Sequence, residues 1–408
     1  MPPDEDARLL RPLLARGVDV TVKDEEGRSL LLRAAASDLL PADIMKTLID
    51  RGADPKATLP GGQTAIGLAR LGGNAAVIDV LKSAGAIDGP APSWPIPKAS
   101  PAASPRAAVE RSLPLLQESD ATFLRKAGCV SCHNNSLTAM TVALARSHGV
   151  RVDEDVAQEQ VEKIGRYLES WRERALQGIG IAGNTDTISY ILFGLSAEAA
   201  PADAATDAMA RYVLREQTPS GFWRILAHRP PIESSDVQVT ALAMRSLQVY
   251  APRYARAEFD AAIRRAAAWL SSAPVTTTED RAFQLLGLGW SAASKTRIRT
   301  AARALIAEQR KDGGWAQLPG LASDAYATGQ ALVALEESGA LTSADPAFKR
   351  GAQFLLNSQM ADGSWYVPSR AFPIQPHFET GFPYGRDQFI SMAASNWAAS
   401  ALALAVKQ

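Results

Sequence analysis

The segment Cys129-Val130-Ser131-Cys132-His133 holds the only two cysteines of the chain and places a histidine directly after the second one. Two cysteines placed at random in a chain of this length fall three apart, with a histidine following, only about once in 20,000 cases. Thiolates and imidazoles bind metal ions, and thiols also form disulfides and thioethers. The spacing therefore indicates a site for metal, redox or covalent attachment chemistry.

Four interpretations of this motif compete. Two thiols at this spacing can reach the two vinyl groups of a porphyrin while the adjacent imidazole takes the iron, and in this the motif resembles the cytochrome c attachment signature. The resemblance implies that Cys129 and Cys132 hold haem c and that His133 is the proximal metal ligand. A structural zinc site needs four ligands and would have to recruit His228, His377 or a carboxylate. A thioredoxin-type redox pair usually lies beside a parallel sheet, which is not expected here, and two inert buried cysteines are the fourth interpretation. We favour haem.

A repeated pattern predicts the elements that position this motif. Three segments read Q-x-x-x-G-x-W, at 217–223, 309–315 and 359–365, and their starts are 92 and 50 residues apart. The larger step is two units of about 46, so a degenerate unit is expected between the first two. Each unit joins an amphipathic helix to a second helix rich in Ala and Leu. Corresponding positions in six such helix pairs are Leu124, Leu168, Val213, Leu270, Leu305 and Leu355.

The Q-x-x-x-G-x-W repeats resemble those of the squalene-hopene cyclase family, and a single ring of six helix pairs resembles the protein prenyltransferase beta subunit. These resemblances imply an all-α fold, an (α/α)6 toroid over residues 109–408, with the Ala-rich helices inside. In such a ring every loop from an outer to an inner helix emerges at the same end, and the cysteine motif aligns with these loops. We therefore expect Cys129, Cys132 and His133 at that end.

Two of the loops expected at this end are long. The loop after Trp223 carries His228, and the loop after Trp365 carries His377. If haem is attached, we favour His377 as its sixth ligand, with His228, Met392, water or an empty position as the alternatives.

The long loop around His377 also contains Glu379, Tyr384 and Arg386, which suit a haem edge or a substrate. A lid held by salt bridges is the other interpretation of these residues.

Acidic residues recur at the starts of the expected inner helices. Asp186, Asp236, Asp280 and Asp324 are 50, 44 and 44 residues apart. An Asp at a helix start caps free amides and meets the positive end of the helix dipole, so helix capping explains the set. Asp236 and Asp324 are nevertheless kept as candidate catalytic residues. The other candidates are His228, Glu379, Tyr384 and Arg386.

The first 88 residues have a different period. Gly17, Gly52 and Gly85 are 35 and 33 residues apart, and Gly27 and Gly62 are 35 apart. This pattern resembles ankyrin repeats and implies a helical stack over residues 1–88 that packs on the next domain or binds a protein partner. Residues 89–108, which are rich in Pro, Ala and Ser, are expected to form a linker.

The chemistry of the related enzymes does not transfer to this chain. Terpene cyclases that protonate an alkene use an Asp-x-Asp-Asp cluster, and the sequence contains none. The prenyltransferases bind zinc with Asp, Cys and His, whereas both cysteines here belong to the haem-type motif. The resemblance still implies an apolar cavity inside the ring. We expect aromatic residues of the inner helices in it, such as Tyr190, Phe283, Tyr326 and Trp397.

Three functions follow as hypotheses. The first is a c-type haem protein on this toroid, acting with a redox partner in electron transfer or oxidising an apolar substrate. The alternative is a divergent terpenoid or prenyl-binding protein, or a cyclase-like enzyme, whose cysteines bind zinc or are inert. The third is an interaction scaffold without catalysis.

Charge and hydropathy limit the partners. The chain has 43 basic and 43 acidic residues, which gives no reason to expect a nucleic acid. No apolar run is long enough to span a membrane. Haem c is attached outside the cytoplasm of bacteria, so the haem hypothesis implies a periplasmic protein whose signal peptide is missing from this chain. Otherwise a cytoplasmic location is expected.

Overall fold

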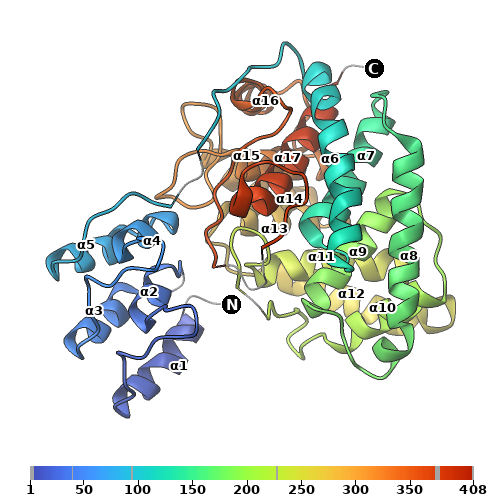
Figure 1. The fold of residues 1–408 in the computed structure, drawn as a ribbon. Helices are drawn as coiled ribbons and strands as arrows, with labels where there is room; N and C mark the ends of the chain where they lie inside the picture. The colour runs from blue at the N-terminus through green and yellow to red at the C-terminus, as the bar shows by residue number, and fades with distance from the viewer. Residues whose placement is uncertain (1–3, 39, 93–94, 227, 373–376, 407–408) are drawn as a thin grey trace. The chain divides into compact units, whose positions relative to one another are not determined.

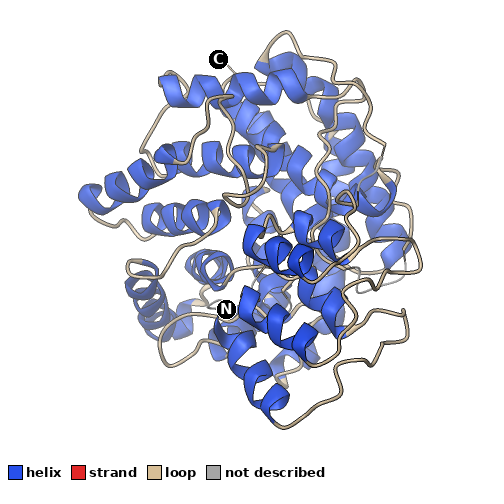
Figure 2. Cartoon of the chain, turned by 90° about the vertical axis from the view of Figure 1, so that its left-hand side faces the viewer, coloured by secondary structure: helices blue, strands red, loops and turns tan. Residues whose placement is uncertain are grey.

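The computed structural model describes residues 4–38, 40–92, 95–226, 228–372 and 377–406, without the side chains of residues 4–9, 132 and 133. The chain divides into two compact units. The first contains residues 1–95 with the short segments 318–322 and 368–375, and the second contains residues 96–317, 323–367 and 376–408. Both are built of helices and loops in the part of the chain that is described (Figure 2). The predicted all-α fold is therefore confirmed.

The first unit is a stack of short helices. Helix α2 contacts α3 and helix α4 contacts α5, and each of these pairs follows an isolated β-bridge, Lys23 with Ser29 and Thr58 with Thr64. These bridges are 35 residues apart, which is the period of the sequence. Whether the repeat belongs to the ankyrin type stays a prediction. The helices are α1 (Asp4–Ala15), α2 (Leu30–Ala35), α3 (Ala42–Asp50), α4 (Ala65–Leu71) and α5 (Ala75–Ser83).

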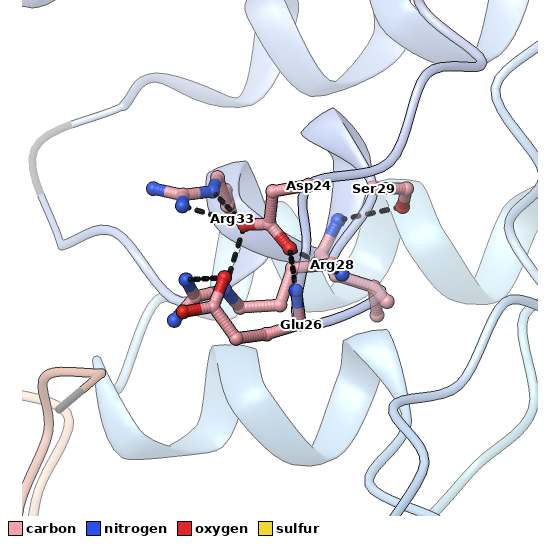
Figure 3. Close-up of polar contacts among 6 residues, drawn as sticks. Asp24, Glu26, Arg28, Ser29 and Arg33 are labelled. Atoms are coloured by element: carbon pink, nitrogen blue, oxygen red, sulfur yellow. Dashed lines mark hydrogen bonds and ion pairs between the residues drawn. The ribbon is translucent and has the colours of Figure 1, made fainter. Parts of the chain in front are cut away.

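A carboxylate holds the turn before α2 (Figure 3). Asp24 accepts hydrogen bonds from the backbone N–H groups of Glu26 and Arg28, at 3.1 and 2.8 Å, and from the Nε atoms of Arg28 and Arg33, both at 2.8 Å. Ser29 then caps α2 by accepting from the backbone N–H of Leu32. Capping and turn bonds of this kind satisfy backbone groups that a short helix leaves free.

The second unit alternates outer and inner helices, as the repeat predicted. The six corresponding apolar positions fall on six outer helices, which are α6 (Pro105–Ala127), α8 (Glu154–Leu176), α10 (Ala204–Arg215), α12 (Arg256–Leu270), α14 (Lys295–Ala307) and α16 (Pro346–Ser358). The inner helices are α7 (Leu137–Ser147), α9 (Asn184–Ala197), α11 (Asp236–Tyr250), α13 (Thr278–Trp290), α15 (Ala325–Glu337) and α17 (Gln388–Leu404). Short turns η1 (Cys132–Ser136), η2 (Arg253–Ala255) and η3 (Gly385–Asp387) complete the elements.

The inner helices form a closed ring. Each contacts the next along the chain, from α7 through α9, α11, α13 and α15 to α17, and α17 contacts α7 again. Their labels can be followed in Figure 1. Small residues permit close packing inside the ring: a Cβ atom on Gly329 of α15 would lie 2.5 Å from the backbone carbon of Trp397 in α17. The (α/α)6 toroid that the resemblance implied is therefore confirmed.

The three Q-x-x-x-G-x-W segments fasten neighbouring outer helices to each other. In each, the indole Nε1 donates to a carbonyl at the end of the preceding outer helix, and the Gln Nε2 donates to a carbonyl of the following one. The third segment closes the circle, because Gln359 Nε2 donates to the carbonyl oxygen of Ala108 in α6 at 2.9 Å. The glycine of each motif has a positive φ, 94° at Gly221, 90° at Gly313 and 91° at Gly363, where a side chain would be strained.

Candidate functional site: the lumen of the helical ring

A cavity of about 300 Å³ lies inside the ring, toward the C-terminal ends of the inner helices. All six inner helices contribute to its wall, and the wall is mainly apolar. This volume and lining fall within the range of sites for small organic ligands. The apolar residues of the wall are Met140, Ala143, Leu144, Phe193, Ala197, Phe283, Leu286, Trp290, Val333 and Trp397.

Polar groups lie at the rim of this cavity. They are Ser147, Ser196, Arg245 and Glu337, which come from four different inner helices. The guanidinium carbon of Arg245 lies 5.8 Å from the centroid of the Trp290 ring, within the range of a cation–π contact.

Glu337 is solvent-exposed as a residue, yet the surrounding protein desolvates its carboxyl group. This desolvation raises the pKa of Glu337, against the positive charges of Arg245 and His148. The rim thus offers one cation and one carboxyl group beside an apolar interior.

A layer of buried carboxyl groups lies one helical turn or more toward the other end of the ring. Glu279 of α13 precedes the cavity residue Phe283 by four positions, so the two share one face of the helix. Its carboxylate accepts hydrogen bonds from Ser234 Oγ at 2.7 Å, Tyr326 OH at 2.8 Å and Gln330 Nε2 at 3.3 Å. Burial raises the pKa of Glu279 to about 7, although these hydrogen bonds favour its charged form.

Asp186 of α9 is the second buried carboxyl group of this layer. Its Oδ1 accepts a hydrogen bond from Gln238 Nε2 at 2.7 Å. Burial raises the pKa of Asp186 to about 6, against that hydrogen bond and the positive charge of Arg229. A buried acid that is protonated near neutral pH can donate a hydrogen bond or a proton.

The cysteine motif lies at the end of the ring where the inner helices begin, as predicted from the repeat. Cys129 follows the last turn of α6, and η1, which contains Cys132 and His133, leads directly into α7. Cys129 is partly buried, and burial raises the pKa of its thiol. The side chains of Cys132 and His133 lie outside the described residues, so their predicted role as haem or metal ligands stays a prediction.

Polar contacts fix the rest of this segment. Asn134 and Asn135 are fully buried, and Asn135 Oδ1 accepts from the backbone N–H of Ser131 at 2.9 Å. The amide Nδ2 of Asn135 donates to the carboxyl group of Asp120 in α6. Burial raises the pKa of Asp120 well above its usual value.

The long loop that was expected beside the motif lies against the end of α6. Lys126 donates to the backbone carbonyl of Glu379, and the rings of Phe123 and Phe378 are 5.4 Å apart between centroids. His377 Nε2 lies 2.7 Å from Glu379 Oε1, and both residues are exposed.

The remaining candidate residues of this loop differ in how far they are buried. Tyr384 is buried, its hydroxyl lies 2.7 Å from Ser364 Oγ, and burial raises its pKa to about 12. Arg386 is exposed. Met392, which was an alternative sixth ligand, is fully buried in an apolar cluster with Phe382 and Tyr384. Tyr384 is therefore inside the protein, whereas Arg386 is at its surface.

The aspartates at the starts of the inner helices have different structural roles. Asp324 caps α15, since it accepts from the backbone N–H of Ala327 at 2.9 Å, and Asp280 belongs to a capping box with Thr277. Asp236 is buried and accepts from the backbone N–H of Ile225 at 2.8 Å, so it holds the preceding loop. The capping interpretation is right for Asp324 and Asp280. Asp236 lies in the first turn of α11, at the positive end of the helix dipole, but Ser235 accepts the capping hydrogen bonds there.

His228 lies in that same loop and is partly buried. The loops that carry His228 and His377 lead into the starts of the inner helices α11 and α17, so both loops lie at the predicted end of the ring. The described cavity, by contrast, lies toward the opposite ends of those helices, where His148 caps the last turn of α7.

The sequence reasoning missed the residues that line or approach the lumen most closely. Phe283 and Trp397 were named, whereas Arg245, Trp290, Glu337 and Glu279 were not. A signal was present, because the spacing from Glu279 to Phe283 is that of one helix face. Among the residues whose side chains are described, no group of three or more His, Cys, Asp and Glu could hold a metal ion. In the same part of the chain, no helix is long and apolar enough to cross a membrane.

The fold and the lumen define a helical toroid with an apolar central cavity, and one comparison with a solved structure agrees on the fold. No protein-family model and no curated protein sequence matches the chain. A crystal structure of a protein from Actinoplanes is similar, with a TM-score of 0.50, 14% identity, and coverage of 74% of this chain and 100% of that chain.

Structures of the type II terpene cyclase MstE from Scytonema are also similar. An aspartate-to-alanine variant in complex with merosterolic acid A has a TM-score of 0.46 and 14% identity, covering 73% of this chain and 98% of that chain. The apo enzyme has a TM-score of 0.45 and 13% identity, covering 71% and 97%.

Proposed function

We propose that the ring binds an apolar, isoprenoid-like small molecule in its lumen. The observation that carries this proposal is the cavity of about 300 Å³, whose wall comes from all six inner helices and consists mainly of aliphatic and aromatic side chains. Burial of apolar ligand surface supplies the affinity, and the few polar groups at the rim orient the molecule. The proposal concerns binding and assigns no turnover.

In this proposal the ligand enters the cavity at the rim, and its apolar body lies in the middle of the lumen. Phe283 and Trp397 meet edge to face, with centroids 6.0 Å apart, and close the inner side of the cavity. Arg245 and Glu337 are at the other side, where a polar end of the molecule would meet water.

A substitution that fills the lumen tests this proposal. Ala143 lines the cavity on α7, whereas Ala268 is exposed on the outer helix α12. We expect the wild-type protein to bind farnesol in isothermal titration calorimetry with a negative heat-capacity change. Ala143→Trp should weaken binding at least about tenfold, because the indole occupies the space of the ligand.

Ala268→Trp is the matched control and should bind farnesol like the wild type. Binding that is equally strong in Ala143→Trp would place the ligand elsewhere and contradict the proposal. Thermal melting of both variants shows whether each is folded.

Covalent haem is a second candidate, favoured by the Cys129-x-x-Cys132-His133 motif and by the partly exposed Cys129. Cys129 and Cys132 would hold the porphyrin through thioethers, and His133 and His377 would be the candidate iron ligands. Bound haem would supply electron-transfer chemistry and would imply a redox partner and a periplasmic location. Zinc held by the same thiols is the alternative.

Co-expression with haem c maturation machinery distinguishes the haem hypothesis from the zinc hypothesis. Haem that survives denaturation, with a Soret band lost in Cys129→Ala/Cys132→Ala, supports attachment. Stoichiometric zinc without iron in the purified protein contradicts it.

A further inference from the structure

Arg245, at the rim of the lumen, differs from the other arginines of the inner helices. These helices contain three arginines, Arg146, Arg245 and Arg281, and no lysine. Arg146 forms salt bridges at 2.7 and 2.9 Å, and Arg281 forms one at 3.8 Å. Arg245 forms no salt bridge with the residues that the structure describes. It is partly buried and lines the cavity, so its guanidinium can meet a ligand that enters there.

Neighbouring side chains position this guanidinium without using most of its donors. Its carbon lies 5.8 Å from the centroid of the Trp290 ring, and Nη1 lies 3.5 Å from Gln248 Oε1, at the limit of a hydrogen bond. Gln248 is anchored in turn, because its Nε2 donates to the backbone carbonyl of Trp290 at 3.0 Å. A guanidinium carries five N–H donors in a planar fork, and this fork fits the two oxygens of a carboxylate.

The rest of the rim makes an anion dependent on Arg245. Glu337 forms no salt bridge with Arg245, so it does not occupy the fork. Desolvation raises the pKa of Glu337, which favours the neutral form of its carboxyl group and lessens its repulsion of an anion. The carbonyl ends of the six inner helices lie on this side of the ring and disfavour an anion. A negatively charged group is therefore stabilised here through direct contact with Arg245.

The charge at the rim also distinguishes between anionic groups. Arg245 is the only Arg or Lys among the described residues that line the cavity. One cation balances the single charge of a carboxylate, whereas a diphosphate would bring several negative charges to a wall without a second Arg or Lys. The carboxylate is therefore the anion that fits.

We infer that Arg245 binds the carboxylate of the ligand, so that the lumen selects an isoprenoid-like carboxylic acid over the corresponding alcohol or amine. The apolar body of this acid lies against side chains such as Phe193, Leu286 and Val333, and its charged end lies at the rim. This inference rests on the proposed function, because it requires an apolar molecule in the lumen. It adds the chemical class of the polar end and the residue that recognises it.

Three probes with one carbon skeleton test the inference by isothermal titration calorimetry at neutral pH. They are farnesoic acid, which carries a carboxylate, farnesol, which is neutral, and farnesylamine, which carries a positive charge. We expect the wild-type protein to bind the acid about tenfold more tightly than the alcohol, as one charge-assisted pair at a partly exposed site predicts. The amine should bind no more tightly than the alcohol, because Arg245 repels it.

Arg245→Gln removes the charge and keeps a polar side chain. It should weaken binding of farnesoic acid at least about tenfold and change binding of farnesol less than about twofold. Arg245→Lys keeps the charge without the fork and should bind the acid more tightly than Arg245→Gln does. Retained binding of farnesol shows that each variant is folded.

Arg146→Gln is the matched control. Arg146 also belongs to an inner helix, α7, but it pairs with Glu154 and Glu198 and does not line the cavity. This variant should change binding of the acid and of the alcohol less than about twofold.

The outcomes separate the inference from the proposed function. If the wild-type protein binds the acid no more tightly than the alcohol, or if Arg245→Gln weakens both alike, the lumen binds apolar molecules and the role of Arg245 is refuted. Tighter binding of the amine than of the acid also refutes that role, because Glu337 and the helix ends would then dominate the rim. If none of the probes binds the wild-type protein, the proposed function fails and the inference fails with it.

Discussion

The buried carboxyl group of Glu279 should make the stability of the ring depend on pH in a way that one substitution removes. Its pKa is raised from 4.5 to about 7, and burial is the main cause. One pKa unit corresponds to about 1.4 kcal/mol, so this change corresponds to on the order of 3 kcal/mol. Below pH 4.5 the group is protonated in the folded and the unfolded chain alike and costs nothing. As the pH rises toward 7, the unfolded chain loses its proton first, and the free energy of unfolding falls.

Glu279→Gln keeps the shape and the hydrogen-bonding capacity of the side chain but cannot ionise. We expect the free energy of unfolding of the wild-type protein to fall between pH 5 and pH 8 by about 2 to 3 kcal/mol more than that of Glu279→Gln. Urea denaturation followed by circular dichroism at both pH values measures this difference.

Glu258→Gln is the control, because Glu258 is exposed on the outer helix α12. Its pH dependence should follow that of the wild type within about 0.5 kcal/mol. A parallel pH dependence of Glu279→Gln and wild type would refute the reasoning, because it would mean that Glu279 is solvated in the folded protein.

Two further predictions concern the closure of the ring. Gln359→Ala removes the bonds from Gln359 Nε2 to Ala108 and Ser112 of α6 and should lower the free energy of unfolding by about 1 to 3 kcal/mol in urea denaturation. Gln353→Ala, at an exposed site of the outer helix α16, should change it by less than about 0.5 kcal/mol. Gly363→Ala should be more destabilising than Gly339→Ala, although both glycines have a positive φ, since a Cβ atom on Gly363 would lie 2.3 Å from the carbonyl oxygen of Arg111 and one on Gly339 meets nothing within 4 Å. Equal losses in either pair would show that ring closure does not depend on these contacts.

The architecture of the ring could be predicted because its signals are local and repeated. The Q-x-x-x-G-x-W segments recur, and the apolar positions from Leu124 to Leu355 fix the frame of the outer helices. Each motif uses the same few bonds, an indole donor to one helix and an amide donor to the next. A pattern that is repeated in this way predicts a fold even where single helices are ambiguous.

The position of the cavity could not be predicted from the same repeat. All inner helices run in one direction, so the sequence places the cysteine motif and the long loops at one end of the ring, as observed. Side chains fill part of the lumen and leave the rest open. The position of the open part depends on how the inner faces of the six helices pack. Phe283 and Trp397 meet there, and the described cavity lies on the side away from the motif.

Neighbouring acidic residues show why the sites of the carboxyl groups were also hard to predict. Glu279 and Asp280 are adjacent in the sequence, and both lie in the first turn of α13. Asp280 completes a capping box, whereas Glu279 points to buried partners on α15. Successive side chains on a helix point about 100° apart. Glu279 and Asp280 therefore have different surroundings, and only the packing of the ring determines which of the two is directed to buried partners.

The central claim is that an apolar molecule occupies the lumen, and photo-crosslinking tests it most directly. A farnesyl probe that carries a diazirine is incubated with the wild-type protein, irradiated and mapped by mass spectrometry, with and without excess farnesol. We predict crosslinks in the segments 140–147 and 283–290, which contribute side chains to the wall of the cavity, and we predict that excess farnesol suppresses them. Crosslinks confined to the outer helices, or crosslinks that farnesol does not suppress, would contradict the account.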